Sequence, residues 1–307
     1  MQRLGTSMEK VIESLFSPLN REEFISAYRE NRPITAHHDI DKFKELSSLK
    51  YLSSLSSLLE SWPSKVNAYS PGIPDEVNST QVDPVQAQKL FDSGSGLYFD
   101  DPNNTEEILA KTLEGLRQDL GLSNLTYSRS LIYAIPKGKG TAPHFDQNIN
   151  FVLQISGTKK WWVAPNTSVE NPMTRYTIGT NPDPELDSYL DEDLPTTFPS
   201  ESTEYELKPG SVLFLPRGTW HKTEATEDAL SLNFTFSAPT WIDMLQTALR
   251  SRLTQSPFWR GTANFTTDLE LHTEAVSMFD TLLDQLKQDV PSWQARDILR
   301  AIEMEPE

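Results

Sequence analysis

The sequence has no cysteine among its 307 residues. This absence excludes disulfide bonds, thiolate metal sites and cysteine nucleophiles together. Long apolar runs are also missing and the mean hydropathy is -0.49, so no transmembrane helix is expected. Residues 1–10 lack the apolar core of a signal peptide. These absences predict a cytoplasmic protein that does not associate with a membrane.

Basic residues are scarce: the sequence has 27 Lys and Arg and 44 Asp and Glu, which give a net charge of -17. Such a surface repels phosphate backbones, and no run of Lys or Arg forms a local basic patch. Nucleic acid is therefore disfavoured as a partner. The acidic charge is compatible with a cationic substrate, but solubility alone is the favoured interpretation.

The first 120 residues are predicted to be mainly helical with polar loops. Asn20 is a helix-start signal, and Gly121 is a helix-stop signal. Together with apolar residues spaced three and four apart, such signals predict helices over 20–30, 47–62 and 104–120. Asn104 or Thr105 is expected to cap the last of these. Residues 63–105 are predicted to be rich in loops, with a short strand at 96–99.

From about residue 125 the apolar period changes from 3.6 to 2, and short β-prone runs are separated by Gly and Pro. This pattern predicts a barrel or sandwich with strands over 128–136, 143–147, 150–156, 159–164, 205–208, 211–215, 222–226 and 229–237. In the last strand Leu and Phe alternate with small polar residues. An apolar outer face and a polar inner face suit a barrel that holds a ligand.

A long Pro-rich insertion at 166–204 interrupts the strands, and the stretch 183–206 holds nine Asp or Glu and no Lys or Arg. Loops of this length inside a domain are usually functional lids or disordered, and we favour a loop at the mouth of the cavity. After Pro239 the helical period returns, with helices expected over 241–253 and along an apolar seam at 276–290. The seam either packs on the barrel or forms a dimer interface.

The residues that can carry chemistry lie in two short motifs. His144 and Asp146 stand in Thr-Ala-Pro-His-Phe-Asp, where a strand would point both to one face. His221 follows Pro-Arg-Gly-Thr-Trp. Two imidazoles and one carboxylate are the facial triad of non-haem Fe(II), with open positions for a chelating co-substrate and O₂. The alternative is two core histidines with hydrogen-bonded neighbours. The other histidines are interpreted as surface or structural residues: His37, His38 and His272.

An anionic co-substrate inside a barrel requires a cation, because an unpaired buried carboxylate is costly. Lys159 is the candidate, since it shares a strand face with Trp161 and Val163. Lys160 lies on the opposite face and serves as an internal control. Candidate hydrogen-bond partners beside the site are Thr141, Asn150 and Asn233.

These motifs together resemble those of the JmjC-type cupin-like oxygenases over about 120–240. The resemblance rests on Thr-Ala-Pro-His-x-Asp, the stretch Asn150 to Lys159, the run Pro-Gly-Ser-Val-Leu-Phe-Leu-Pro-Arg-Gly-Thr-Trp-His, and Ser-Leu-Asn-Phe. The family includes the asparaginyl hydroxylase that inhibits hypoxia-inducible factor, and the ribosomal oxygenases. It implies a double-stranded β-helix that binds Fe(II), 2-oxoglutarate and O₂. The implied iron ligands are His144, Asp146 and His221.

The resemblance also implies how the co-substrate is held. Lys159 would pair with the distal carboxylate of 2-oxoglutarate, with Thr141 beside it. The implied supporting residues are Asn150, Asn233 and Tyr98, the last in Gly-Leu-Tyr-Phe. A lysine here is similar to the asparaginyl hydroxylase, because the ribosomal oxygenases use an arginine, whereas Trp161 is similar to the ribosomal type. The substrate therefore stays open.

The expected fold is a mainly β core with helices, a cupin or jelly-roll double-stranded β-helix over 121–240. It is flanked by an N-terminal helical region, 1–120, that packs on the barrel and a C-terminal helical region, 241–307, that is a candidate for dimerisation. The expected function is an Fe(II)- and 2-oxoglutarate-dependent dioxygenase that hydroxylates an amino-acid side chain in a protein, peptide or peptide natural product. One alternative is a small-molecule tailoring oxygenase. The other is a non-catalytic metal-binding cupin, which has no need of a cradle formed by Lys159 and Thr141.

Overall fold

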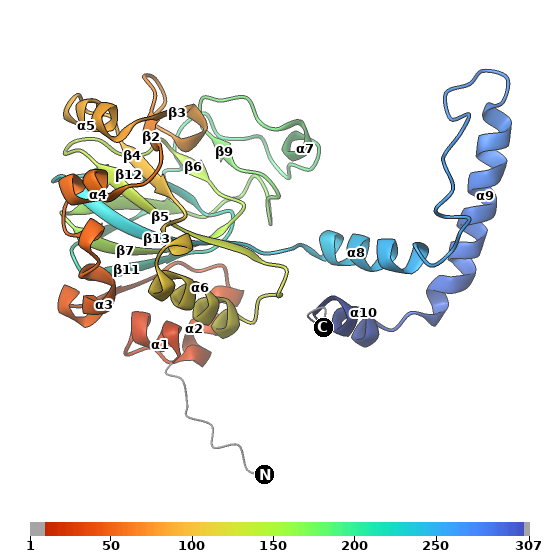
Figure 1. The fold of residues 1–307 in the computed structure, drawn as a ribbon, viewed down its shortest axis with the longest axis horizontal. Coiled ribbons are helices and arrows are strands. Elements are labelled where there is room, and N and C mark those ends of the chain that lie inside the picture. The colour runs from red at the N-terminus through yellow and green to blue at the C-terminus, as the bar shows by residue number, and fades with distance from the viewer. Residues whose placement is uncertain (1–9, 304–307) are drawn as a thin grey trace, which may run out of the picture. The chain divides into compact units, whose positions relative to one another are not determined.

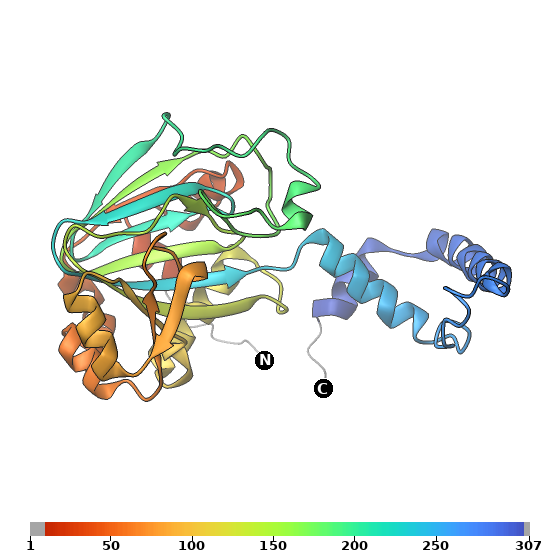
Figure 2. The same ribbon diagram turned by 90° about the horizontal axis from the view of Figure 1, so that it is seen from above.

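Two antiparallel β-sheets dominate the fold in the computed structural model, which describes residues 10–303 (Figure 1, Figure 2). The predicted lack of a signal peptide concerns mainly residues 1–9, which lie outside this range. The chain divides into two units. The first runs to Leu122 and resumes over Tyr127–Ser237, whereas the second comprises Ser123–Thr126 and the chain from Ala238 onward.

The larger sheet of the first unit has the strand order β1-β11-β7-β13-β5-β4-β2-β3. Its strands are β1 (Ile34–His37), β2 (Val66–Tyr69), β3 (Ser79–Val82), β4 (Leu97–Asp100), β5 (Tyr127–Ile135), β7 (Ile149–Ser156), β11 (Ser211–Leu215) and β13 (Ala229–Ser237). The smaller sheet has the order β10-β8-β12-β6-β9. Its strands are β6 (His144–Phe145), β8 (Lys159–Ala164), β9 (Tyr176–Thr177), β10 (Thr203–Leu207) and β12 (Trp220–Ala225). Residues of both sheets line one cavity, so the predicted jelly-roll fold is confirmed.

Helices of the N-terminal segment share the main hydrophobic core with the larger sheet. They are α1 (Val11–Phe16), α2 (Arg21–Arg29), α3 (Lys44–Ser47), α4 (Leu55–Ser61), α5 (Pro84–Asp92) and α6 (Glu107–Leu120). Phe24 of α2 stacks on Phe151 of β7 at 6.0 Å between ring centroids and meets Phe214 of β11 at 4.9 Å. The predicted alternation in β13 is confirmed, because its Leu and Phe residues lie in this core and Asn233 faces the cavity.

Several predicted elements begin and end where expected. Asn20 caps α2 in a capping box with Glu23. Gly121 ends α6 in the left-handed conformation, with φ of 67°. The expected cap of α6 is wrong, since the N-cap is Glu106 and Asn104 lies in the preceding 3₁₀ turn, Pro102–Asn104.

The single helix predicted over 47–62 is also wrong. The chain forms the end of α3, a 3₁₀ turn at Lys50–Leu52, and α4. The Ser53 hydroxyl donates to the Lys50 carbonyl at 2.8 Å, and the Ser54 hydroxyl accepts from the Ser57 amide at 3.1 Å. Serine side chains that bond to the local backbone compete with helix continuation and form caps, so the serine-rich run is divided.

The loop-rich region predicted at 63–105 contains more regular structure than expected. It holds β2, β3 and α5 in addition to the predicted β4. Asp83 caps α5 by accepting from the Gln86 amide at 2.8 Å, and Pro84 occupies the first turn. Of these, β4, β2 and β3 extend the larger sheet beyond β5.

The insertion at 166–204 contributes β9 and the short helix α7 (Pro184–Asp187). Its apolar side chains pack around Phe145 and Trp220 on the smaller sheet. Phe145 lies between His144 and Asp146 in the sequence and therefore points to the opposite face. Much of the insertion thus covers the outside of the smaller sheet, while β9 pairs with β6, the strand that carries His144.

The second unit is helical, with α8 (Trp241–Leu253), α9 (His272–Asp289), a 3₁₀ turn (Val290–Ser292) and α10 (Ala295–Glu303), of which α10 was not predicted. No α9 residue is buried, and Val276 and Phe279 of the apolar seam are 45% and 55% exposed. Across residues 10–303, no helix combines the length and apolar character needed to cross a membrane.

Candidate active site

Three side chains from the two sequence motifs converge on one point between the sheets. His221 lies within β12 and pairs directly with His144 of β6, so its strand begins at Trp220, earlier than the predicted 222. The Nε2 atoms of His144 and His221 lie 4.0 Å and 3.7 Å from oxygens of Asp146. One ion can reach all three residues, which form the metal-binding cluster found within the described part of the chain.

Backbone carbonyls fix the tautomer of both imidazoles in the form that a metal ligand requires. His144 Nδ1 donates to the Ala142 carbonyl at 2.7 Å, and His221 Nδ1 donates to the Thr219 carbonyl at 2.9 Å. Because a carbonyl can only accept, each Nε2 keeps its lone pair toward Asp146. Burial lowers the pKa of both imidazoles, so they stay neutral as ligands must be.

The carboxylate of Asp146 is held on both oxygens. Asn150 Nδ2 donates to Asp146 Oδ2 at 2.9 Å, and the Asn150 carbonyl oxygen accepts from the Thr235 hydroxyl at 2.8 Å. The other oxygen, Oδ1, lies 3.2 Å from Nη1 of Arg175. Asn150 therefore lies beside Asp146 and restricts the orientation of its carboxylate.

Three charged residues beside the ligands were not predicted: Asp75, Glu76 and Arg175. Arg175 comes from the insertion and lies between Asp75, Glu76 and Asp146. Glu76 lines the cavity and accepts a hydrogen bond from the Tyr133 hydroxyl. Burial raises the pKa of Glu76. No sequence motif marks these residues, because they come from loops 100 positions apart.

Lys159 projects into the same cavity, as the strand alternation predicted. Its side chain is buried, with Nζ 5.1 Å from the Trp161 ring and 5.7 Å from the Tyr133 ring. Among the described residues it has no hydrogen bond or ion pair, and burial lowers its pKa to about 7. Lys160 instead points outward and bonds Glu204 at 2.8 Å.

The polar atoms around Lys159 fit a carboxylate ligand. The Trp161 indole N–H and the Asn233 side-chain carbonyl are buried in the cavity wall without partners in the described structure. The Thr141 hydroxyl also lines the cavity, 2.6 Å from the Thr223 hydroxyl. A buried cation beside the unpaired Trp161 N–H donor matches the needs of a dicarboxylate such as 2-oxoglutarate, whereas the Asn233 carbonyl can only accept a hydrogen bond.

Tyr98 is the one predicted site residue that does not line the cavity. It pairs in register with Tyr133 across β4 and β5, and its hydroxyl lies 2.9 Å from that of Ser79. Tyr133 is one strand nearer the ligands and forms the cavity wall. Tyr133 rather than Tyr98 therefore lines the cavity, because β5 rather than β4 borders the site.

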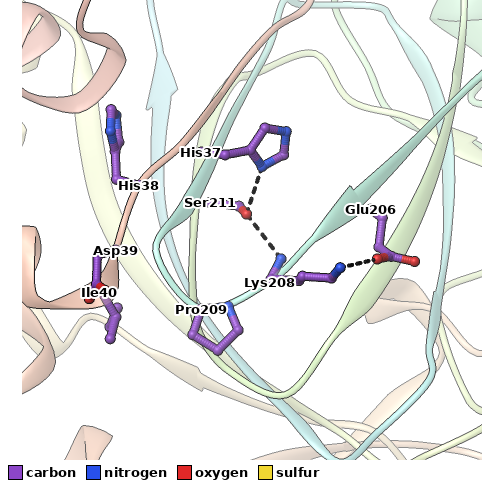
Figure 3. A pocket seen from close by; sticks show the side chains of 8 residues that line it. All are labelled: His37, His38, Asp39, Ile40, Glu206, Lys208, Pro209 and Ser211. Carbon is purple, nitrogen blue, oxygen red and sulfur yellow. Dashed lines mark hydrogen bonds and ion pairs between the residues drawn. The ribbon is translucent and has the colours of Figure 1, made fainter.

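The other three histidines lie away from the metal-binding cluster. His37 and His38 border an open pocket of about 630 Å³ (Figure 3), where His37 Nδ1 lies 2.9 Å from the Ser211 hydroxyl. His38 Nε2 lies 2.9 Å from the Leu15 carbonyl. His272 Nδ1 lies 3.0 Å from the Thr266 carbonyl at the start of α9. Their interpretation as surface or structural residues agrees with these contacts.

The fold and the site define a cupin-type metal-binding protein with a cationic cradle. The JmjC domain family matches residues 111–244. The uncharacterized protein YxbC of Bacillus subtilis is 30% identical over 286 residues, which cover 91% of this chain and 86% of that protein. The chain belongs to the JmjC-type family of Fe(II)- and 2-oxoglutarate-dependent oxygenases.

Two further similarities are more distant. Ribosomal oxygenase 2 of Rattus norvegicus is 28% identical over 253 residues, which cover 78% of this chain. The chain spans about half the length of that relative. The X-ray structure of YcfD from E. coli superimposes with a TM-score of 0.51 at 18% identity, covering 87% of this chain and 67% of that one. This last similarity shows a shared fold.

Proposed function

We propose that the protein is an Fe(II)- and 2-oxoglutarate-dependent dioxygenase that hydroxylates an amino-acid side chain in a protein, peptide or peptide natural product. The observation that carries the proposal is the buried Lys159 ammonium, which faces the same cavity as His144, Asp146 and His221. A pure metal-binding module would gain nothing from a buried ammonium that makes no hydrogen bond or ion pair and has only the more distant Glu76 as an attractive charge. Relatives named ribosomal oxygenases support a protein as the substrate.

The residues divide into two groups. His144, Asp146 and His221 would hold Fe(II), and Lys159 would pair with the distal carboxylate of 2-oxoglutarate. When bound, the iron and co-substrate supply the oxidising chemistry, in which one atom of O₂ enters succinate and the other enters the substrate. Thr141 and Asn233 offer further hydrogen bonds within the same wall.

The side chains around this site also control protons and water. The backbone carbonyls of Ala142 and Thr219 keep the Nδ1 protons, so both imidazoles bind without a proton leaving. Val152 and Leu215 add apolar surface to the cavity. This surface limits water and strengthens the attraction between Lys159 and a carboxylate.

We further propose that the exposed apolar seam of α9 pairs with a second copy of the chain. Val276, Phe279 and Val290 of this seam are 45%, 55% and 46% exposed. An a/d-like seam with spacings of three and four suits a helix–helix interface.

Oxygen incorporation tests the proposed reaction. The purified protein, Fe(II), ascorbate and 2-oxoglutarate are incubated with a fractionated protein and peptide extract, and mass spectrometry searches for side chains that gain one oxygen atom. We expect a gain that requires His144 and persists in a His272→Ala control. Gains confined to small molecules would favour a tailoring oxygenase. No gain together with no consumption of 2-oxoglutarate would favour a non-catalytic cupin.

A further inference from the structure

A buried network connects the insertion to the metal-ligand carboxylate. Asp75 is fully buried and accepts three hydrogen bonds: from Arg175 Nη2 at 2.8 Å, from the Thr177 hydroxyl at 2.9 Å and from the Val77 amide at 3.0 Å. The same guanidinium reaches Asp146 Oδ1 with Nη1 at 3.2 Å. Asp75, Arg175 and Asp146 therefore form a chain of charges that ends on a metal ligand.

Backbone hydrogen bonds hold the two segments that carry this charge network, β9 and the loop of Asp75, against the residues around His144. Thr177 of β9 pairs with His144 of β6, and these strands lie side by side (Figure 1). The Ala142 amide donates to the Pro74 carbonyl at 2.9 Å, which ties the Asp75 loop to the residues just before His144. A guanidinium fork fixed by a buried carboxylate is a rigid support, since it offers two donors in one plane.

Arg175 lies behind the Asp146 carboxylate rather than among the residues that line the cavity. Its side chain is 15% exposed and is absent from the cavity wall that Asp146 lines. It acts on the site through Asp146, whose other oxygen is held by Asn150. With both oxygens held, the carboxylate is restricted to one orientation before a metal arrives.

We propose that Asp75 and Arg175 are positioning residues for the metal site: Asp75 anchors the Arg175 guanidinium, and Arg175 fixes the Asp146 carboxylate. The insertion thereby becomes part of the metal site's support as well as a cover for the smaller sheet. This inference rests on the proposed function, because it assigns a role relative to the iron ligands.

Metal titration of variants tests the proposal with a readout independent of turnover. Co(II) affinity and the visible d–d spectrum of the bound ion are measured for the wild type, Arg175→Met and Asp75→Asn. The matched control is Arg129→Met, which removes a half-buried arginine–aspartate pair with Asp100 at 3.1 Å that touches no metal ligand. Loss of outer support typically weakens metal affinity 10–100-fold.

We expect Co(II) binding to weaken by about 10–100-fold in Arg175→Met and by about 10-fold in Asp75→Asn, with an altered d–d spectrum in both. Arg129→Met should match the wild type. Affinities within twofold of the wild type, or an equal loss in Arg129→Met, would overturn the positioning role. If Arg175→Met does not fold, the Asp75→Asn variant decides by the same criteria. A wild type that binds no Co(II) would instead contradict the proposed function.

Discussion

Raising the pH from 6.5 to 8.5 is predicted to weaken 2-oxoglutarate binding about 25-fold through Lys159. Burial lowers the pKa of this lysine to about 7 in the unliganded protein. A carboxylate partner favours the charged form, so binding above pH 7 must take up a proton. The apparent dissociation constant for 2-oxoglutarate rises by the factor 1 + 10^(pH − 7), which is about 1.3 at pH 6.5 and about 33 at pH 8.5. The ratio corresponds to roughly 1.9 kcal/mol of binding free energy.

Calorimetric titration of Mn(II)-loaded protein with 2-oxoglutarate, in buffers of different ionisation enthalpy, measures both the affinity and the proton uptake. Lys160→Met should keep the pH profile, because Lys160 is an outward residue paired with Glu204. Lys159→Met should bind weakly at every pH and lose the slope. An affinity that stays constant from pH 6.5 to 8.5, or an unchanged slope in Lys159→Met, would refute the reasoning.

Three further predictions concern stability and assembly. Because the folded-state pKa of Lys159 lies below its unfolded value, its burial costs stability most below pH 7. The unfolding free energy of Lys159→Met should exceed that of the unliganded wild type by roughly 5 kcal/mol at pH 6, and the gap should close toward pH 10 in urea unfolding. A constant gap would contradict this linkage. Phe24→Ala should cost about 3–5 kcal/mol of unfolding free energy, because Phe24 is fully buried, whereas exposed Phe258→Ala should cost little; equal losses would argue against the shared core. Light scattering should find a dimer that Phe279→Asp dissociates and Gln285→Ala preserves, and a monomeric wild type would exclude the proposed seam.

The ligand motifs were predictable because strand periodicity is local. His144 and Asp146 stand two residues apart, and Lys159 alternates with Lys160, so the sequence itself indicates which side chains share a face. The long-range partner His221 could be proposed because its residue type completed a known ligand set. Its position within β12 was missed, since the Gly-Thr turn before it suggested a later start to the strand.

The network around Arg175 was not predictable for a physical reason. Asp75 and Arg175 are 100 positions apart and meet only because β9 pairs with β6. Neither lies in a periodic segment, and an arginine in an acidic insertion has an obvious alternative as a surface residue. Tyr98 was named from the resemblance alone, and Tyr133 was not foreseen in the cavity wall, because alternation gives the face of a residue but not the order of strands around the cavity.

Local signals were present for some elements that were missed. Asp83 and Pro84 form an N-cap and first-turn pair that marks the start of α5. In the serine-rich run at 47–62 the local signals conflicted. Its leucine spacing was helical, but its serine side chains form caps and turns that divide the segment. Leu52 and Leu58 are nevertheless buried, so apolar spacing predicted burial better than it predicted helix continuity.

The most direct test of the central claim is succinate formation from 2-oxoglutarate by the purified protein with Fe(II), ascorbate and O₂. We predict slow turnover by the wild type without added substrate, loss of turnover and bound metal in His144→Ala, and a far higher 2-oxoglutarate requirement in Lys159→Met than in Lys160→Met. No succinate from the wild type, together with unchanged metal content in His144→Ala, would contradict the assignment of this cavity as an oxygenase site.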